Sequence, residues 1–349
     1  MQSQRPTLTA QPYNLHTISL SSKNVDPTLF FCRTPLQAMI VKQLLLRFSG
    51  PIVVIYHATS SSEKHKYYFD QIEANQKYFV PWRPIRGSDV LSALRVWWEI
   101  PRILRKTRYA TLLIASIGSV AFSLFASRNK DAIIQTFDDG TFNLDNKSFN
   151  EWISFEPISH KFIKKLFDGI SNSEIISRVS CHYSIYPSRF VEPSSCTIKE
   201  IDLFSSWSDL NLNKNGEKIR IILGSWFHDT HLQLQHDIIV SSGKFNIFLP
   251  HPADSRSALF FGKTLLNNNV IDFDKMIAED VIKALISSGY SPTVYGFGSS
   301  VLINLAHYIP AINITFTNSR QGISCDRWSQ LGVRSIRYNV KADKYSFKT

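Results

Sequence analysis

The sequence predicts an α/β protein with two doubly wound parallel sheets. Two stretches of the 349-residue chain, 28–140 and 218–338, alternate short β-branched or aromatic runs with apolar-periodic stretches of helical length. Such alternation is typical of βαβ units, whose strands form parallel sheets. Polar loops and scattered helical stretches lie between them. We therefore expect an N-terminal domain at 27–215, with an irregular helical insertion at about 141–215, and a C-terminal domain at 216–349.

The first half of the chain shows its elements in order. Residues 1–26 are polar and without periodicity, and we expect them to form a flexible tail. Apolar residues at 28–32 predict the first strand. A helix is expected to begin at Pro35, because the missing N–H of a proline in the first helical turn would have no partner anyway. The other elements expected in this half are strands at 51–56, 111–115 and 132–137 and a helix at 63–75.

Three strands are expected in the second half, near 219–223, 245–249 and 293–297, and each is followed by Gly, Pro, His or Ser. Ligands of open parallel sheets bind outside the carboxyl ends of the strands. These polar residues are therefore expected to converge on one crevice. They are Gly224, Ser225, His251, Ser299 and Ser300.

The composition is that of a globular protein, with 44% hydrophobic and 19% charged residues. The sequence has no apolar run long enough to span a membrane, and its first 26 residues lack the apolar segment of a secretory signal. We therefore expect a cytoplasmic protein. The cysteines are far apart and form no CxxC pair, which favours neither a zinc site nor a disulfide framework.

The formal net charge of +11 predicts an anionic partner. The stretch 83–108 is rich in arginine, and tryptophans and aliphatic residues alternate with the cations. A helix with this pattern can lie on an anionic lipid surface, and an ordinary surface helix with its apolar side in the core is the alternative. The sequence carries no motif of a nucleic-acid-binding domain, so nucleic acid is not an expected partner.

Five segments together resemble glycosyltransferase family 52 in their order and spacing. They are FFCRTPLQ at 30–37, YYFDQI at 67–72, TFDDGTFNL at 136–144, RIILGS at 220–225 and PHP at 250–252. The likeness covers roughly residues 28 to 320. It implies two Rossmann-like domains that face a central cleft, the GT-B type of glycosyltransferase fold. A homodimer is suggested by the resemblance alone.

That family contains bacterial lipooligosaccharide and capsule sialyltransferases. The resemblance implies an inverting transfer of N-acetylneuraminic acid from its CMP derivative, CMP-Neu5Ac, to a terminal galactose of a surface glycan, most often in α2,3 linkage. It also implies catalysis without a metal or other cofactor, although the Asp138-Asp139 pair can mimic a metal site. A related enzyme using another sugar nucleotide and an inactive glycan-binding homologue are the alternatives.

Sialyl transfer needs a base for the acceptor hydroxyl and a group that stabilises the departing phosphate. The prolines on both sides of His251 fix its backbone, and the resemblance favours this histidine at the phosphate. For the base, the resemblance favours Asp229. The rivals are Asp138 or Asp139, and also His228, because the chain carries two residues more than the family pattern before the aspartate.

The remaining candidates bind substrate. Serines after Gly298 fall at a helix N-terminus, where hydroxyls and free N–H groups suit a phosphate, and Glu279 matches a family acidic pair that can contact the ribose or the cytosine. An N-cap serine and a solvated helix carboxylate are the ordinary interpretations of these residues. The candidate substrate and CMP-binding residues are Gly224, Ser225, Pro252, Glu279, Gly298, Ser299, Ser300, Arg33 and Thr34.

Overall fold

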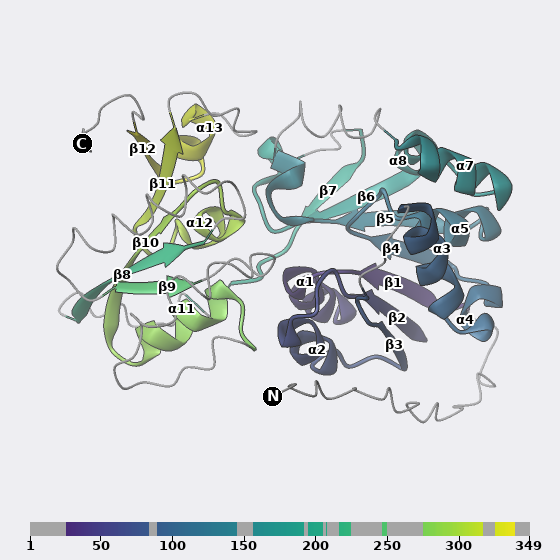
Figure 1. Ribbon diagram of the computed structural model, residues 1–349, viewed down its shortest axis with the longest axis horizontal. Helices are drawn as coiled ribbons and strands as arrows, with labels where there is room; N and C mark the ends of the chain where they lie inside the picture. Colours follow the sequence, from purple (N-terminus) through teal and green to yellow (C-terminus); the bar gives the residue numbers. More distant parts are fainter. Residues whose placement is uncertain are drawn as a thin grey trace, which may run out of the picture.

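The computed structural model contains two α/β units, each built on its own parallel sheet (Figure 1). It describes residues 26–83, 89–144, 156–191, 195–204, 207, 216–224, 246–249, 275–316 and 325–338. The N-terminal unit lies on the right of Figure 1 and the C-terminal unit on the left. The α/β fold class with two parallel sheets that the sequence predicts is confirmed.

The sheet of the N-terminal unit has seven parallel strands in the order β3-β2-β1-β4-β5-β6-β7. Thr28 in β1 lies opposite both Ile52 in β2 and Thr111 in β4. The chain first builds β2 and β3 on one side of β1 and then crosses to β4 on the other side. The strand order therefore reverses between β1 and β4, which is the point where open sheets bind ligands. The strands are β1 (Thr28–Cys32), β2 (Ile52–His57), β3 (Gln76–Val80), β4 (Thr111–Ile114), β5 (Ile133–Phe137), β6 (Val179–Ser184) and β7 (Thr197–Glu200).

Several helices of this unit begin at polar caps. Helix α1 starts at Pro35, as the sequence predicts, and the hydroxyl of Thr34 accepts a hydrogen bond from the backbone N–H of Gln37. Helix α5 is capped in the same way by Ser119. The helices are α1 (Pro35–Leu45), α2 (Glu63–Asp70), α3 (Asp89–Glu99), α4 (Arg102–Lys106), α5 (Val120–Arg128), α7 (Ile158–Leu166) and α8 (Asn172–Ser177), with short 3₁₀ helices at Gly140–Leu144 and Ser188–Phe190.

One expectation for this unit needs correction. The stretch 141–215 was expected to be an irregular helical insertion, and it does hold α7 and α8, but it also adds β6 and β7 to the sheet. Strand β6 is almost wholly buried although it contains His182 and Ser184. The polar side chains make the strand hard to recognise from the sequence. Their hydrogen-bond partners lie on β5 or just after it, far away in the chain.

The C-terminal unit has a second parallel sheet, in the order β12-β11-β10-β8-β9. Its strands are β8 (Glu217–Leu223), β9 (Asn246–Leu249), β10 (Tyr290–Gly296), β11 (Ala311–Phe316) and β12 (Arg334–Tyr338), and its described helices are α11 (Ala278–Ser287), α12 (Ser300–Leu305) and α13 (Cys325–Gln330). The three strands expected in this half are confirmed as β8, β9 and β10. Each is parallel to its neighbour, so their carboxyl ends meet at one edge of the sheet.

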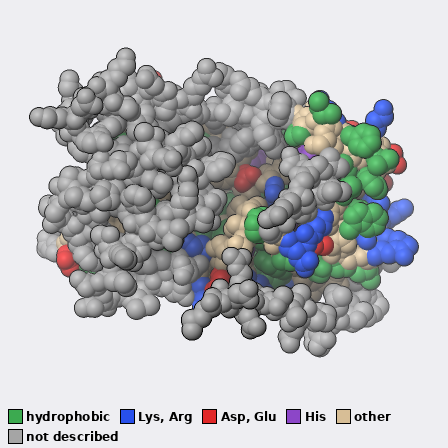
Figure 2. Space-filling view, in the orientation of Figure 1, with side chains coloured by type: hydrophobic (Ala, Val, Ile, Leu, Met, Phe, Trp, Pro, Cys, Tyr) green, Lys and Arg blue, Asp and Glu red, His purple; other side chains and the backbone are tan. Residues whose placement is uncertain are grey.

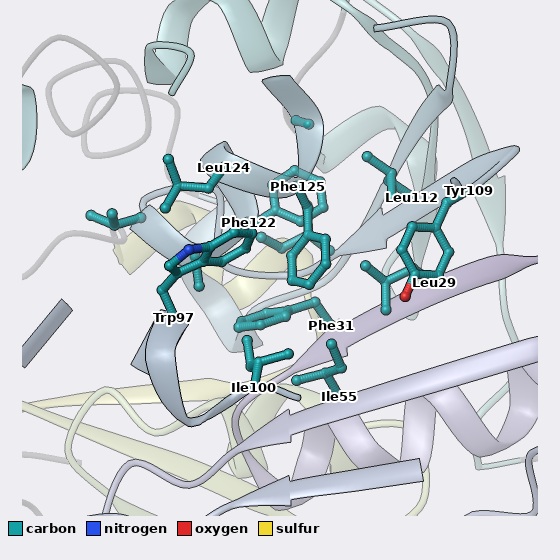
Figure 3. Close-up of a cluster of buried hydrophobic side chains, with 14 of the residues drawn as sticks. Leu29, Phe31, Ile55, Trp97, Ile100, Tyr109, Leu112, Phe122, Leu124 and Phe125 are labelled. Carbon is teal, nitrogen blue, oxygen red and sulfur yellow. The ribbon is translucent and has the colours of Figure 1, made fainter. Parts of the chain in front are cut away.

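Strand β1 is buried on both faces, and alternate side chains enter two different cores. Leu29 and Phe31 join a cluster with the helices α3 and α5 (Figure 3), whereas Phe30 and Cys32 face α1. In the first cluster the rings of Trp97 and Phe125 meet edge to face with centroids 5.0 Å apart. Each fully buried aromatic side chain of this kind contributes about 1.5–3 kcal/mol. The strand is therefore a rigid support for the residues that follow it.

The two units share a third core. The second sheet packs against Tyr186, Phe204 and Trp207, which precede β8 in the chain. The boundary that we expected at residue 216 falls directly before β8, and it remains a prediction, because these three side chains from before it belong to the core of the C-terminal unit. A hydrogen bond from the Arg327 guanidinium to the carbonyl of Leu144, 3.2 Å long, also joins the two units.

Candidate active site

Several residues that the sequence singled out lie at the carboxyl edges of the two sheets. Arg33 and Thr34 follow β1, and Asp138 and Asp139 follow β5. In the C-terminal unit, Gly224 follows β8, Gly298, Ser299 and Ser300 follow β10, and Glu279 lies in the first turn of α11. Ser225, His228, Asp229, His251 and Pro252 lie outside the described residues, and their roles remain predictions.

Asp138 is fully buried, and its carboxylate is held by three donors. Oδ2 accepts hydrogen bonds from the hydroxyl of Ser184 at 2.8 Å and the backbone N–H of Ile185 at 2.6 Å. Oδ1 lies 3.0 Å from Nε2 of His182, whose other ring nitrogen lies 2.8 Å from the Thr136 hydroxyl. Because this carboxylate is fully buried, an acceptor hydroxyl cannot reach it. We conclude that Asp138 ties β5 to β6.

Asp139 has a different environment. Its Oδ1 accepts a hydrogen bond from Gln37 Nε2 at 2.5 Å, and its Oδ2 accepts one from the Ser116 hydroxyl at 2.7 Å. The side chain is only half-buried. Each oxygen keeps a second lone pair. Asp139 is therefore the member of the pair that a substrate can reach, and it stands where β1, β4 and β5 end, beside the reversal of strand order.

Gly140 brings this turn to the other unit. Its φ of +61° lies in the left-handed region that favours glycine. A Cβ added there would lie 3.8 Å from the hydroxyl oxygen of Ser300, the first residue of α12. The Asp-Asp-Gly turn of the first unit and the Gly-Ser-Ser turn of the second are thus neighbours. The convergence of Gly224, Ser225, His251, Ser299 and Ser300 that the sequence predicts remains a prediction.

A buried asparagine in the neighbouring strand β11 holds the Gly-Ser-Ser turn. The backbone N–H of Gly298 donates to Asn313 Oδ1 at 2.8 Å, and Asn313 is fully buried. Gly298 has a φ of +69°, and a Cβ there would meet no atom of the described structure within 4 Å. Ser299 occupies the N-cap of α12 but makes no capping hydrogen bond with its side chain. The turn therefore presents open backbone and a hydroxyl that does not cap its helix.

Glu279 is buried rather than solvated. Its Oε1 accepts a hydrogen bond from Asn304 Nδ2 at 2.8 Å, which links α11 to α12. Burial raises the pKa of Glu279 above its usual value, and the hydrogen bond from Asn304 opposes that effect. The ordinary interpretation of a surface helix charge is therefore wrong for this residue. Its contact with ribose or cytosine remains a prediction.

Tyr186 is a site residue that the sequence did not indicate. Its side chain is buried, and its hydroxyl has no hydrogen-bond partner within the described part of the chain. Burial raises the pKa of Tyr186 well above its usual value, and the carboxylates of Asp138, Glu279 and Asp139 add to the effect. Tyr186 therefore lies in the electric field of carboxylates from both units. A tyrosine that follows a strand carries no specific signal in a sequence.

Other residues of the site also escaped the sequence. Gln37 and Ser116 hold Asp139, and His182 holds Asp138. Gln37 was part of a segment that resembles the family, and this was its only signal. In the ranges that the structure describes, no group of three His, Cys, Asp or Glu side chains is placed to bind a metal ion. Catalysis without a metal remains a prediction.

The architecture defines a class of protein. Two Rossmann-like units, with polar turns from both units close together at the carboxyl edges of their sheets, have the GT-B arrangement. The model of glycosyltransferase family 52 matches residues 50–319. The chain therefore belongs to glycosyltransferase family 52, and the resemblance seen in the sequence is confirmed.

Two relatives are similar along most of the chain. An N-acetyllactosaminide alpha-2,3-sialyltransferase of Neisseria meningitidis serogroup A / serotype 4A (strain DSM 15465 / Z2491) is 25% identical over 262 residues, which cover 72% of this chain and 69% of the relative. A CMP-N-acetylneuraminate:beta-galactoside alpha-2,3-sialyltransferase of Pasteurella multocida (strain Pm70) is 21% identical over 319 residues, covering 88% of this chain and 98% of the relative.

Solved structures give more distant matches. A UDP-GlcNAc 2-epimerase from Neisseria meningitidis bound to UDP-GlcNAc has a TM-score of 0.49 and 9% identity, and the match covers 88% of this chain and 86% of that one. MurG of Acinetobacter baumannii has a TM-score of 0.44 and 11% identity, with 89% and 86% of the two chains covered.

Proposed function

We propose that this protein is an inverting sialyltransferase that transfers N-acetylneuraminic acid from CMP-Neu5Ac to a terminal galactose of a bacterial surface glycan, lipooligosaccharide or capsule, in α2,3 linkage. Membership of family 52 over residues 50–319 is the observation that carries the proposal. Both relatives are named alpha-2,3-sialyltransferases, and one is named for CMP-N-acetylneuraminate and a beta-galactoside. The proximity of Gly140 to Ser300 supports a site shared by the two units.

In the proposed reaction a base removes the proton of the acceptor hydroxyl. The acceptor oxygen then attacks C2 of the sialic acid from the face opposite the phosphate, the bond from C2 to the phosphate oxygen breaks, and the configuration inverts. Asp229 is the proposed base, and His251 protonates or hydrogen-bonds the departing CMP phosphate. Asp139 remains the rival base, because it is the reachable carboxylate of its turn.

The C-terminal unit holds the nucleotide in this proposal. The turn of Gly298, Ser299 and Ser300 faces the CMP phosphate with its hydroxyls and backbone. Gly224 and Ser225, with Pro252, line the nucleotide side. Glu279 is fixed by Asn304. It needs no metal to bind ribose hydroxyls or the cytosine amine, since its carboxylate accepts those hydrogen bonds directly.

We also propose that the enzyme is cytoplasmic and contacts the anionic inner membrane leaflet through α3, α4 and α7. In the described part of the chain no helix has the length and apolarity of a membrane span. Helix α7 packs against α3 and α5. It exposes Ile158, Phe162 and Leu166, which are 86%, 63% and 62% exposed and share one face because they are four residues apart.

The neighbouring elements extend this surface. Trp98 at the end of α3 and Ile103 in α4 are 58% and 61% exposed. Exposed cations lie near these apolar side chains in the sequence. Figure 2 shows hydrophobic and basic side chains gathered on the right of the view, where the N-terminal unit lies. Apolar side chains that insert between lipids, with cations at the headgroups, fit an anionic bilayer. The exposed cations are Arg102, Lys106, Arg108, Lys161 and Lys165.

The test of the function is transfer from CMP-Neu5Ac to lactose by the purified protein in EDTA, with CMP release and product measured together. We expect α2,3-sialyllactose, which would support the donor, the reaction and the independence from metal at once. Binding of a uridine or guanosine nucleotide in place of CMP would favour another donor, and CMP binding without turnover on any galactoside would favour an inactive glycan-binding protein.

A homodimer, proposed on the resemblance alone, is tested by sedimentation.

A further inference from the structure

Arg33 places a guanidinium at the edge of the sheet where ligands of open sheets bind. It follows β1, next to the reversal of strand order between β1 and β4. Its side chain is half-buried, and its Nε is buried without a hydrogen-bond partner among the described residues. An arginine nitrogen left in this way costs stability unless a ligand satisfies it.

The surroundings of Arg33 hold its backbone and place one carboxylate near its guanidinium. Its backbone N–H donates to Gln37 Oε1 at 2.7 Å, and Gln37 Nε2 donates in turn to Asp139. Asp139 acts on the guanidinium through space, while its two oxygens are bonded to Gln37 and Ser116 instead. The imidazole of His57, at the end of β2, is kept neutral by burial and by the charge of Arg33.

The positive charge of Arg33 restricts its ligand to an anionic group. The donor phosphate is assigned to the turn of Ser299 and Ser300 in the other unit, so the group that meets Arg33 belongs to the sugar or to the acceptor. A carboxylate carries one negative charge and fits the two-pronged face of a single guanidinium. The sugar ring of sialic acid carries one charged group, the carboxylate on C1, next to the reacting C2.

We propose that Arg33 binds the C1 carboxylate of the sialic acid during transfer and so selects sialyl donors over uncharged sugars. The inference rests on the proposed sialyl transfer. Anchoring C1 fixes the position of C2 toward the acceptor oxygen, since the two carbons are bonded to each other. Arg33 therefore positions the reacting atom from the N-terminal unit, while the C-terminal unit holds the nucleotide.

The experiment compares CMP-Neu5Ac with its C1 methyl ester, which lacks the charge, in the wild type, Arg33→Gln and Arg33→Lys. We expect the wild type to prefer the carboxylate by about 30-fold or more in kcat/KM, the size of a charge-assisted hydrogen bond. Arg33→Gln should lose most of that preference and Arg33→Lys only part. The Kd of CMP, which has no sialyl carboxylate, should change less than twofold in both variants.

The control is Arg95→Gln, because Arg95 pairs with Glu99 on α3 and should keep the full preference. An Arg33→Gln enzyme that is slower with both donors by the same factor overturns the inference, since its arginine then acts on structure or on the acceptor. A wild type that neither binds nor turns over CMP-Neu5Ac refutes the proposed function itself. If Arg33→Gln does not fold, the test uses Arg33→Lys and the same ratio of kcat/KM values for CMP-Neu5Ac and its methyl ester.

Discussion

The hydroxyl of Tyr68 joins the two units by donating a hydrogen bond to the carboxylate of Asp280. The same oxygen accepts a hydrogen bond from the backbone N–H of Ile277, 3.1 Å away. Tyr68 lies in α2 of the N-terminal unit, whereas Ile277 is the N-cap residue of α11 in the other unit. One phenol therefore fixes the start of the helix that carries Glu279.

Replacing this phenol should affect both stability and nucleotide binding. Tyr68→Phe removes both hydrogen bonds and leaves a carboxylate and an N–H without them, so we expect a loss of about 1–3 kcal/mol in the free energy of unfolding. The Kd of CMP should rise as Glu279 loses its fixed position. Urea denaturation and calorimetry measure the two effects. Tyr67→Phe, a change at the exposed neighbour, is the matched control and should alter neither.

Asp138 and Asp139 should respond differently to the same change. Asp138→Asn places an amide NH₂ among three donors, so we expect a loss of about 3 kcal/mol in the free energy of unfolding. Asp139→Asn should cost less stability and reduce turnover. Denaturation and initial rates, measured on both variants, separate the roles. An Asp138→Asn protein as stable as the wild type but inactive would show that Asp138, not Asp139, does the chemistry.

Because His57 and His65 are buried, we expect the protein to lose stability in mild acid. Burial lowers the pKa of His57 to about 3, with help from Arg33 and His65, and burial lowers that of His65 to about 4. In the unfolded chain both titrate near 6.5. The unfolded state therefore binds more protons between these values. The contribution of the two histidines is complete above about pH 6.5 and is lost as the pH falls toward 4, by about 1.4 kcal/mol per pH unit for each histidine.

Denaturation at pH 7.5, 6.0 and 5.0 measures this slope. His57→Asn and His65→Gln should each make the dependence shallower, because each removes one of the two titrating groups. His65→Gln should also lose stability at pH 7.5, since the ring of His65 lies within hydrogen-bond distance of both Tyr56 and Ser60. A slope that is unchanged in both variants would assign the acid sensitivity to other groups.

The surface on α7 should determine membrane binding. Phe162→Ser with Leu166→Ser removes apolar area that is mostly exposed, so folding should be little affected while co-sedimentation with phosphatidylglycerol vesicles falls several-fold. Leu46→Ser, at the 80% exposed C-cap residue of α1, is the control. Equal binding to phosphatidylcholine vesicles, or equal loss in the Leu46→Ser protein, would contradict this surface as an anionic-lipid site.

Much of the fold could be predicted because its strands are plain in the sequence. Strands β1, β2, β4 and β5 are short apolar runs between turn residues, and Pro35 marks a helix start by its own chemistry. Strand β3 mixes polar and aromatic residues at an edge of the sheet, and β7 is four mostly exposed residues. Such strands exist only because a neighbour pairs with them, and no local pattern reports that.

The site was less predictable for the same reason. From the sequence alone, Asp138 and Asp139 are equally good candidates for the base. Strand β6, more than forty positions later, supplies His182 and Ser184, which enclose Asp138 only. Tyr186 could be recognised as a site residue only from the structure, because the carboxylates near it come from both units. The turns after strands were predictable, because parallel sheets always present them at one edge.

The shared core has a consequence for how the protein is made. The N-terminal sheet is continuous in sequence, so it can form on the ribosome before β8 has been synthesised. Tyr186, Phe204 and Trp207 emerge with it, yet the sheet that covers them is the last part to be translated. During that interval a nascent chain holds aromatic side chains in water, where they attract chaperones or other unfinished chains. The order of synthesis, and not only the final structure, therefore limits how quickly this enzyme can be produced without aggregation.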